Sequence, residues 1–206
     1  MAGTPFAGYA NGDILLERRR LERTVVLVQR AVTAGLFRTQ PVLIVARRLN
    51  VEVGRQSADD LAPEEFDRLL AAGEMMADDT AMDVFIWSTG GGGGFSQDLL
   101  PPFSLGRAEW DKWLLGRATR RGFAVVDATA LLQPVHLTDA GGNFASRRHD
   151  GPAASDSLSA SNRELYAAAA INGSIDSCVR ISCASFSVGP DPAGGWALVL
   201  HEETAL

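Results

Sequence analysis

"QPVLIVARRLNVEV", residues 40–53, is the stretch that decides the fold. A proline precedes a continuous apolar run rich in β-branched residues, which is typical of a strand buried on both faces of a parallel or mixed sheet. Residues 82–88, "MDVFIWS", and the start of "FAVVDATALLQPVH", residues 123–136, predict further strands of the same kind. Such strands need packing layers on both sides.

Helical patterns lie between these strands. Leu21, Val25, Val28 and Val32 form one apolar stripe at helical spacing, with arginines and glutamates opposite. Helices are expected within residues 11–32, 61–77, 107–122 and 162–175, the last ending at Asn172-Gly173. The alternation predicts an α/β protein with a mixed sheet flanked by helices.

The 206 residues fit one domain that buries its core without metals or disulfides. We expect a stub at residues 1–10, a folded body at 11–190 and a tail at 191–206. The Gly-, Ser- and Asp-rich residues 139–160 are expected to form a flexible loop. Cys178 and Cys183 fit neither a CxxC pattern nor a disulfide framework and are expected to be ordinary thiols.

The composition excludes several classes of protein. A formal net charge of −6 argues against a general nucleic-acid binder, which needs clustered positive charge. No apolar run approaches the roughly 20 residues that span a bilayer, and the first ten residues do not resemble a signal peptide. A cytoplasmic protein is the default expectation, with a secretory lumen the alternative if a longer chain precedes this one.

The glycine run at residues 90–94 does not predict a phosphate-binding loop, although such loops are rich in glycine. No Lys-Ser/Thr follows it and no GxGxxG enters a helix, so a tolerated loop insertion is the simpler interpretation.

Polar residues at the ends of the expected strands are the candidates for a site. Asn11 and Asp13, two apart just before an apolar stretch, supply oxygen ligands that suit a divalent cation, although an Asn-Gly turn followed by a helix cap is the simpler interpretation of the pattern alone. Arg47 and Arg48 follow the strand at residues 42–46, where open α/β sheets bind anionic ligands; a solvated arginine pair is the alternative. His136 ends a later strand segment near Asp127; a lone histidine is more often structural, but this position makes it a candidate for the site.

The stretch "LPPFSLGRAEWDKWL", residues 100–114, contains a further candidate. Trp110 and Trp113 lie at helical spacing and are expected to anchor the helix to the sheet. Asp111 lies at the border of that face, either as a charge favourable to the helix dipole or as a site residue. Arg107 precedes the helix and could bind a carboxylate or an anion.

The order and spacing of five sequence segments, called sequence words below, resemble those of glycosyltransferase-like, nucleotide-diphospho-sugar transferase proteins of the GT-A type. The five segments are "NGDILL", "VLIVARRLNVEV", "DVFIW", "LPPFSLGRAEWDKWL" and "FAVVDATALLQPVH". The resemblance covers residues 11–136 and, more faintly, 162–175. It implies a partial GT-A-like, Rossmann-like sheet. Members of this family carry a nucleotide-binding βαβ half before the first word, whereas ten residues precede it here.

The resemblance implies metal-dependent transfer of a sugar from a nucleotide-sugar donor to an unidentified acceptor. Asn11, Asp13 and His136 would then bind Mn²⁺ or Mg²⁺, and Asp111 would orient or deprotonate the acceptor hydroxyl. The donor and its phosphates would contact the arginines Arg47, Arg48 and Arg107. The alternative is a truncated or degenerate homologue that serves as a binding module without catalysis.

Overall fold

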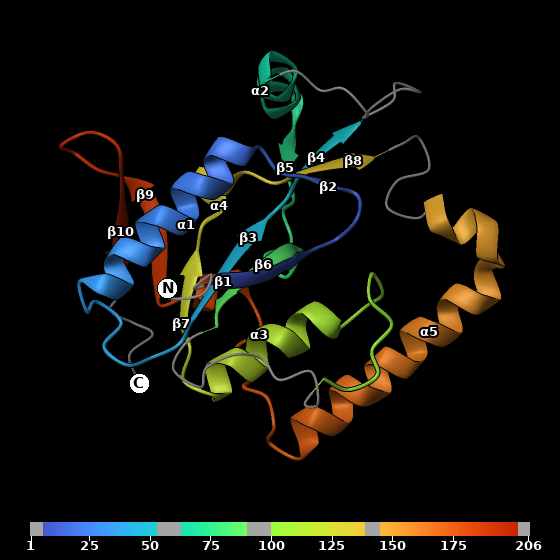
Figure 1. Ribbon diagram of the computed structural model, residues 1–206. Helices are drawn as coiled ribbons and strands as arrows, with labels where there is room; N and C mark the ends of the chain where they lie inside the picture. Colours follow the sequence, from blue (N-terminus) through green and yellow to red (C-terminus); the bar gives the residue numbers. More distant parts are fainter. Residues whose placement is uncertain (1–5, 53–62, 90–99, 139–144, 202–206) are drawn as a thin grey trace.

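The computed structural model describes residues 6–52, 63–89, 100–138 and 145–201. Its centre is a six-stranded mixed sheet (Figure 1). The three strands β3, β7 and β9 run parallel, while β6 and β10 pair with their neighbours in antiparallel fashion. In spatial order the strands are β1 (Phe6–Ala10), β6 (Met82–Ser88), β3 (Val42–Arg47), β7 (Ala124–Asp127), β9 (Phe186–Pro190) and β10 (Trp196–Leu200).

A second sheet of four short strands adjoins the first, because only Arg48 separates β3 from β4. Its order is β2 (Ile14–Leu15), β8 (Val135–Thr138), β4 (Leu49–Glu52) and β5 (Glu74–Met75). The helices are α1 (Arg18–Thr33), α2 (Pro63–Ala72), α3 (Trp110–Arg120), α4 (Thr129–Leu132) and α5 (Ala145–Ile171), with a 3₁₀ turn at Ile181–Cys183.

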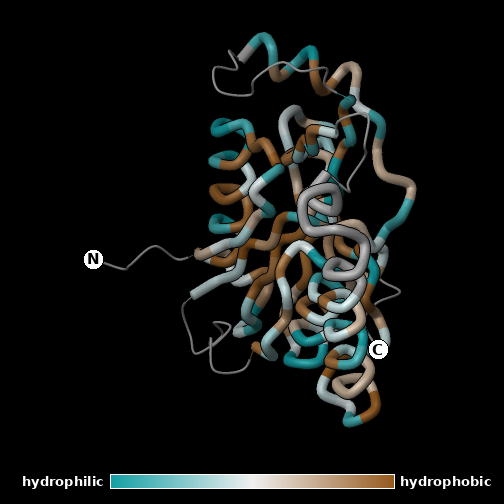
Figure 2. Tube along the Cα trace, turned by 90° about the vertical axis from the view of Figure 1, so that its right-hand side faces the viewer, coloured by the Kyte–Doolittle hydropathy of each residue, from teal (hydrophilic) through white to brown (hydrophobic). Residues whose placement is uncertain are grey.

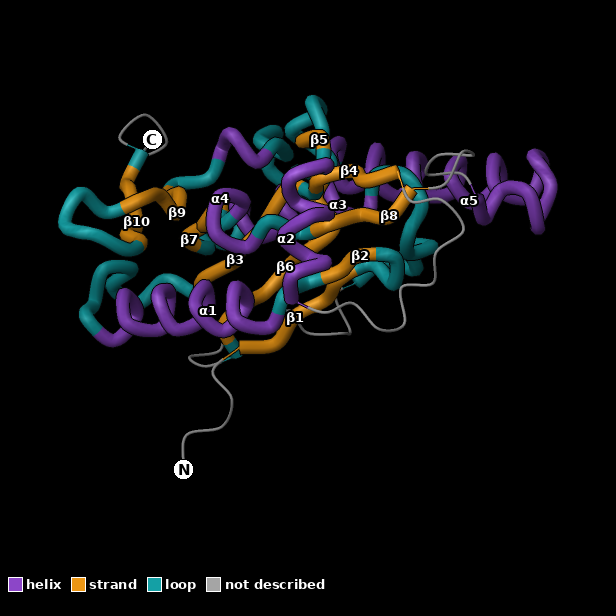
Figure 3. Tube along the Cα trace, turned by 90° about the horizontal axis from the view of Figure 1, so that it is seen from above, coloured by secondary structure: helices purple, strands orange, loops and turns teal. Residues whose placement is uncertain are grey.

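Strand β3 forms the centre of the core because its side chains alternate between the two faces of the sheet. Leu43 and Val45 belong to a cluster that includes Trp113 of α3, and Ile44 belongs to the opposite cluster, which includes Val28 of α1. Hydrophobic residues accordingly concentrate along the sheet in Figure 2, and α1 lies along one side of the sheet in Figure 3. The prediction of an α/β protein with mixed sheets flanked by helices is confirmed.

The expected boundaries differ from the structure in three places. Residues 6–10, expected to be part of a stub, form β1, and residues 196–200, in the tail for which one possible strand was expected, form β10 at the edge of the central sheet. Residues 145–160, expected within a flexible loop, are helical and belong to α5, while 139–144 lie outside the described residues. Small and polar residues dominate this part of α5. Such a composition is typical of loops, and for this reason the helix was not predicted here. The expected helix end near Asn172-Gly173 is confirmed, since α5 ends at Ile171.

No helix in the described ranges is long and apolar enough to cross a membrane.

Cys178 and Cys183 form a disulfide, with their Cα atoms 6.0 Å apart, so the expectation of two ordinary thiols is wrong. Their five-residue separation is compatible with a bond because the chain turns through the 3₁₀ segment before Cys183.

We expect replacement of both cysteines by serine to lower the free energy of unfolding by about 2 kcal/mol, the loop-closure value for so short a loop. Urea unfolding of the wild type with and without reductant, beside the double variant, measures the effect. Reductant should lower the stability of the wild type alone; equal stability of oxidised and reduced wild type would show that the disulfide does not contribute.

Candidate functional site

Polar side chains gather where β3 ends, at the edge at which open α/β sheets bind ligands. Val84 of β6 pairs with Ala10 of β1 on one side and with Ala46 of β3 on the other. The residues next to these three positions therefore meet at one edge of the sheet. We call the resulting group the polar edge; it comprises Tyr9, Asn11, Asp13, Arg48, Asp83, Asp111 and His136.

Asp83 is the centre of the polar edge. Its carboxylate accepts a hydrogen bond from Nη1 of Arg48 at 2.8 Å and another from the side-chain amide of Asn11. The side chains of Arg48 and Asp83 are only 12% and 7% exposed, so the two charges form a buried ion pair. The Tyr9 hydroxyl donates to Oδ1 of Asn11 at 3.0 Å, and this bond extends the network to β1.

The network also perturbs Tyr9 itself. Burial raises the pKa of the Tyr9 hydroxyl, and the negative charges of Asp13 and Asp83 raise it further. The hydroxyl is therefore a stable hydrogen-bond donor at neutral pH.

Asp13 and His136 form a second pair in the polar edge. Because Ile14 of β2 pairs with His136 of β8, the preceding Asp13 lies beside the imidazole, with Oδ2 3.0 Å from Nε2. The imidazole is buried, whereas the Asp13 side chain is 59% exposed. The hydrogen bond with His136 lowers the pKa of Asp13 against the opposing effect of burial, and the charge of Arg48 also lowers it. Asp13 thus offers an ionised carboxylate to solvent.

Asp111 lies in the first turn of α3, between two anchors. Trp110 and Trp113 are buried, as expected, and Trp110 makes an edge-to-face contact with Tyr9 at a centroid distance of 5.0 Å. Burial raises the pKa of Asp111 to about 7, and the charge of Asp83 contributes, while the backbone N–H of Lys112 opposes the shift. A carboxyl with a pKa near neutrality can accept or release a proton under physiological conditions.

A buried asparagine of α5 is hydrogen-bonded to the loop that precedes α3 and Asp111. Asn162 is fully buried; its Nδ2 donates to the carbonyl oxygens of Ser104 and Ala108 at 3.0 and 2.9 Å. Its Oδ1 accepts from the backbone N–H of Ser104 at 2.9 Å. One side chain therefore satisfies three backbone groups just before α3 begins.

We expect Asn162→Ala to lower the free energy of unfolding by about 2–3 kcal/mol, because it leaves buried backbone groups without partners. Arg163→Ala changes an exposed neighbour on the same helix and serves as the matched control. Urea unfolding of both variants measures the difference, and equal stabilities would show that Asn162 does not hold this loop.

Of the three arginines predicted as donor contacts, one lies in the polar edge and two do not. Arg48 belongs to the polar edge, whereas the backbone N–H of Arg47 donates to Oγ1 of Thr129. Arg107 lies in the loop before α3, where its guanidinium donates to the carbonyl oxygen of Gly106 at 3.4 Å. Among the described residues, no hydrogen bond joins the guanidinium of Arg47 or Arg107 to the polar edge.

Asp83 and Tyr9 were not among the site residues predicted from the sequence. Asp83 interrupts the apolar run "MDVFIWS", and a carboxylate inside a fully buried strand is itself a signal because it needs a partner. Tyr9 lay in the segment expected to be a stub, so nothing directed attention to it.

The residues proposed for a divalent cation fit in part. Asp13 and His136 place a carboxylate oxygen and an imidazole nitrogen together, a donor pair that suits Mn²⁺ better than Mg²⁺. The Asn11 side chain is instead bonded to Asp83 and Tyr9. Within the described ranges there is no group of three or more His, Cys, Asp and Glu side chains that could hold a metal. A cation here would therefore take two protein ligands and complete its coordination with phosphate oxygens and water.

Comparison of the chain with protein-family models, with curated proteins and with solved structures finds no match.

Proposed function

We propose that the polar edge transfers a sugar from a nucleotide-sugar donor to an acceptor hydroxyl, with help from a divalent cation. The observation that carries the proposal is that the polar edge contains two carboxylates in opposite states. Asp13 has a lowered pKa and is exposed, whereas Asp111 is largely enclosed with a pKa of about 7. Paired groups whose environments push their pKa values apart are typical of acid–base sites.

Asp13 and His136 form the donor side of the proposed site. Together they would hold Mn²⁺ or Mg²⁺ beside the donor diphosphate. The bound cation would offset the negative charge that the diphosphate gains as it leaves. The hydrogen bond with His136 holds the pKa of Asp13 below its ordinary value, the positive charge of Arg48 adds to this effect, and Asp13 is therefore ionised.

Asp111 forms the acceptor side. As the acceptor oxygen bonds to the anomeric carbon, the bond from that carbon to the diphosphate breaks, and the nucleoside diphosphate departs with the bonding electrons. The acceptor hydroxyl loses its proton in the same process, and the Asp111 carboxylate receives it. A base with a pKa near the working pH is well matched to this transfer.

The order of the sequence words supports the same reaction, since it resembles GT-A transferases from residue 11 to residue 136. Five of the seven residues singled out from the sequence lie in the polar edge: Asn11, Asp13, Arg48, Asp111 and His136. A GT-A-type arrangement of the mixed sheet is part of this proposal.

Release of nucleoside diphosphate from a panel of UDP- and GDP-sugars, with Mn²⁺ present and water as acceptor, tests the proposed function. Release that falls at least about a hundredfold in both Asp13→Ala and Asp111→Asn is the expected result. Arg163→Ala, an exposed change on α5, is the control. Release that is unchanged in both site variants would contradict the proposal.

A further inference from the structure

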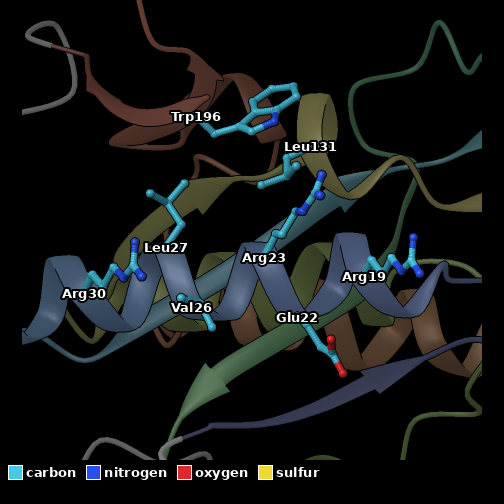
Figure 4. A pocket seen from close by; sticks show the side chains of 8 residues that line it. All are labelled: Arg19, Glu22, Arg23, Val26, Leu27, Arg30, Leu131 and Trp196. Atoms are coloured by element: carbon cyan, nitrogen blue, oxygen red, sulfur yellow. The ribbon is translucent and has the colours of Figure 1, made fainter. Parts of the chain in front are cut away.

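A groove of about 400 Å³ lies along α1, apart from the polar edge (Figure 4). It is bounded by α1, the short helix α4 and the edge strand β10. We call it the arginine groove; its lining includes Arg19, Arg23, Arg30, Leu27, Leu131 and Trp196. It shares no residue with the polar edge.

Three arginines give the groove its charge. Arg19, Arg23 and Arg30 lie within about 40° of one another around the helix, since each residue advances about 100°. They span about 16 Å along its axis at 1.5 Å per residue. Figure 4 shows all three side chains on the same side of α1. Among the described residues, no hydrogen bond or ion pair engages the guanidinium group of any of the three; the backbone N–H of Arg19 donates to the carboxylate of Glu17.

The acidic neighbour in the groove does not neutralise them. Glu22 is already bound to Arg18, with Nε 2.7 Å from Oε1. Helix α1 contains five arginines and a single glutamate, in a chain whose net charge is −6. The positive charge is therefore concentrated locally against the overall balance of the protein.

The position of this charge also opposes the stability of the helix. Arg18, Arg19 and Arg20 occupy the first turn of α1, which contains no acidic residue. A single carboxylate, that of the N-cap Glu17, lies against them and accepts hydrogen bonds from the backbone N–H groups of Arg19 and Arg20. Positive charges at this end are unfavourable to the helix dipole. Arg20 bonds to Gln133, which gives it a structural role, but Arg19 has no such bond among the described residues. Glu17 offsets one of these three charges, and an anionic ligand would offset those that remain.

The other walls of the groove are apolar. Trp196 of β10 is half-buried and lies above Leu131 of α4 in the view of Figure 4, on the side of α1 to which the arginines extend. A row of guanidinium groups beside an indole is the combination that binds phosphates and stacks a planar base.

We propose that the arginine groove binds a ligand of the nucleotide class, with phosphates on the arginine row and the base against Trp196. A phosphate ion alone would leave the indole unused, and an acidic peptide would lack a planar ring for it. The shared chemistry of base and phosphate occurs both in free nucleotides and in short single-stranded RNA. The length of the row accommodates either.

Nuclear magnetic resonance of the four tryptophan indole N–H groups tests this proposal. The probes are ATP, hexauridylate, tripolyphosphate and hexaglutamate, all in EDTA so that metal-dependent binding at the polar edge does not contribute. Trp196→Phe identifies the indole resonance of Trp196. Arg23→Ala and Arg30→Ala remove charges from the row, and Arg163→Ala is an exposed control outside the groove.

ATP or hexauridylate is expected to shift the Trp196 resonance and to bind at least about tenfold more tightly than tripolyphosphate or hexaglutamate, because only the first two can stack. Arg23→Ala and Arg30→Ala should each weaken this binding severalfold, and Arg163→Ala should not. Tighter binding of hexauridylate than of ATP identifies the ligand as single-stranded RNA, and the reverse order identifies a free nucleotide. The proposal would be overturned if neither ATP nor hexauridylate shifts the Trp196 resonance. It would also be overturned if tripolyphosphate or hexaglutamate binds as tightly as ATP and hexauridylate do.

Discussion

Asp83→Ala is expected to lower the free energy of unfolding by about 3–5 kcal/mol, because it leaves the buried guanidinium of Arg48 without its partner. The Asn11 amide loses an acceptor in the same change. Chemical unfolding in urea near neutral pH measures the loss.

The matched control removes both charges. Asp83→Leu combined with Arg48→Met should be less destabilising than Asp83→Ala alone, since no unpaired charge remains buried. An Asp83→Ala variant within about 1 kcal/mol of the wild type would show that Arg48 finds water or another partner.

The second large effect concerns pH. The pKa of Asp111 is raised from 3.8 to about 7 by burial, so the folded protein binds a proton that the unfolded chain releases above about pH 4. The stability contributed by this group is fully present below pH 4 and is lost as the pH rises towards 7. The slope approaches about 1.4 kcal/mol per pH unit within that window and levels off above it.

Asp111→Asn removes this titration. The free energy of unfolding of the variant minus that of the wild type should therefore rise by a few kcal/mol between pH 4 and pH 8. Urea unfolding of both proteins across this range measures the difference, and taking the difference cancels the other titrating groups. A difference independent of pH would contradict the raised pKa of Asp111.

The same substitution separates stability from activity. Asp111→Asn should be at least as stable as the wild type at pH 8 and yet lose about 10²–10⁴-fold in donor turnover, the usual contribution of a positioned base. A variant that is both stable and inactive would identify Asp111 as a site residue.

The central strands could be predicted from the sequence because β3, β6 and β7 are short apolar runs buried on both faces. The polar edge could be predicted in part for the same reason. Arg48 follows a predicted strand and lies at its end, whereas Asn11 and Asp13 were singled out as an Asn-x-Asp pair, because the strand β1 that precedes them was not expected.

What the sequence did not reveal depends on pairings distant along the chain. The side chain of Asp83 is hydrogen-bonded to Arg48, 35 residues away along the chain, and to Asn11, 72 residues away. Neither partner can be inferred from the residues next to Asp83 in the sequence. Strand β1 is a short edge strand whose pattern is weak until its partner β6 is known, and the possible strand expected in the tail becomes part of the central sheet as β10 only through its pairing with β9. The start of α5 was not predicted because its residues favour loops. The disulfide was not predicted because the spacing of its two cysteines matches no common motif.

The most direct test of the central claim is calorimetric titration of the protein with UDP and with GDP, with and without Mn²⁺. Wild type is expected to bind one of these nucleotides more tightly when Mn²⁺ is present, and Asp13→Ala should lose only the metal-dependent part. Any binding that persists in EDTA reports on the arginine groove and should instead be weakened severalfold in Arg23→Ala. Absence of a metal-dependent increment for either nucleotide, in protein shown to be folded, would contradict the assignment of the polar edge as a nucleotide-sugar site.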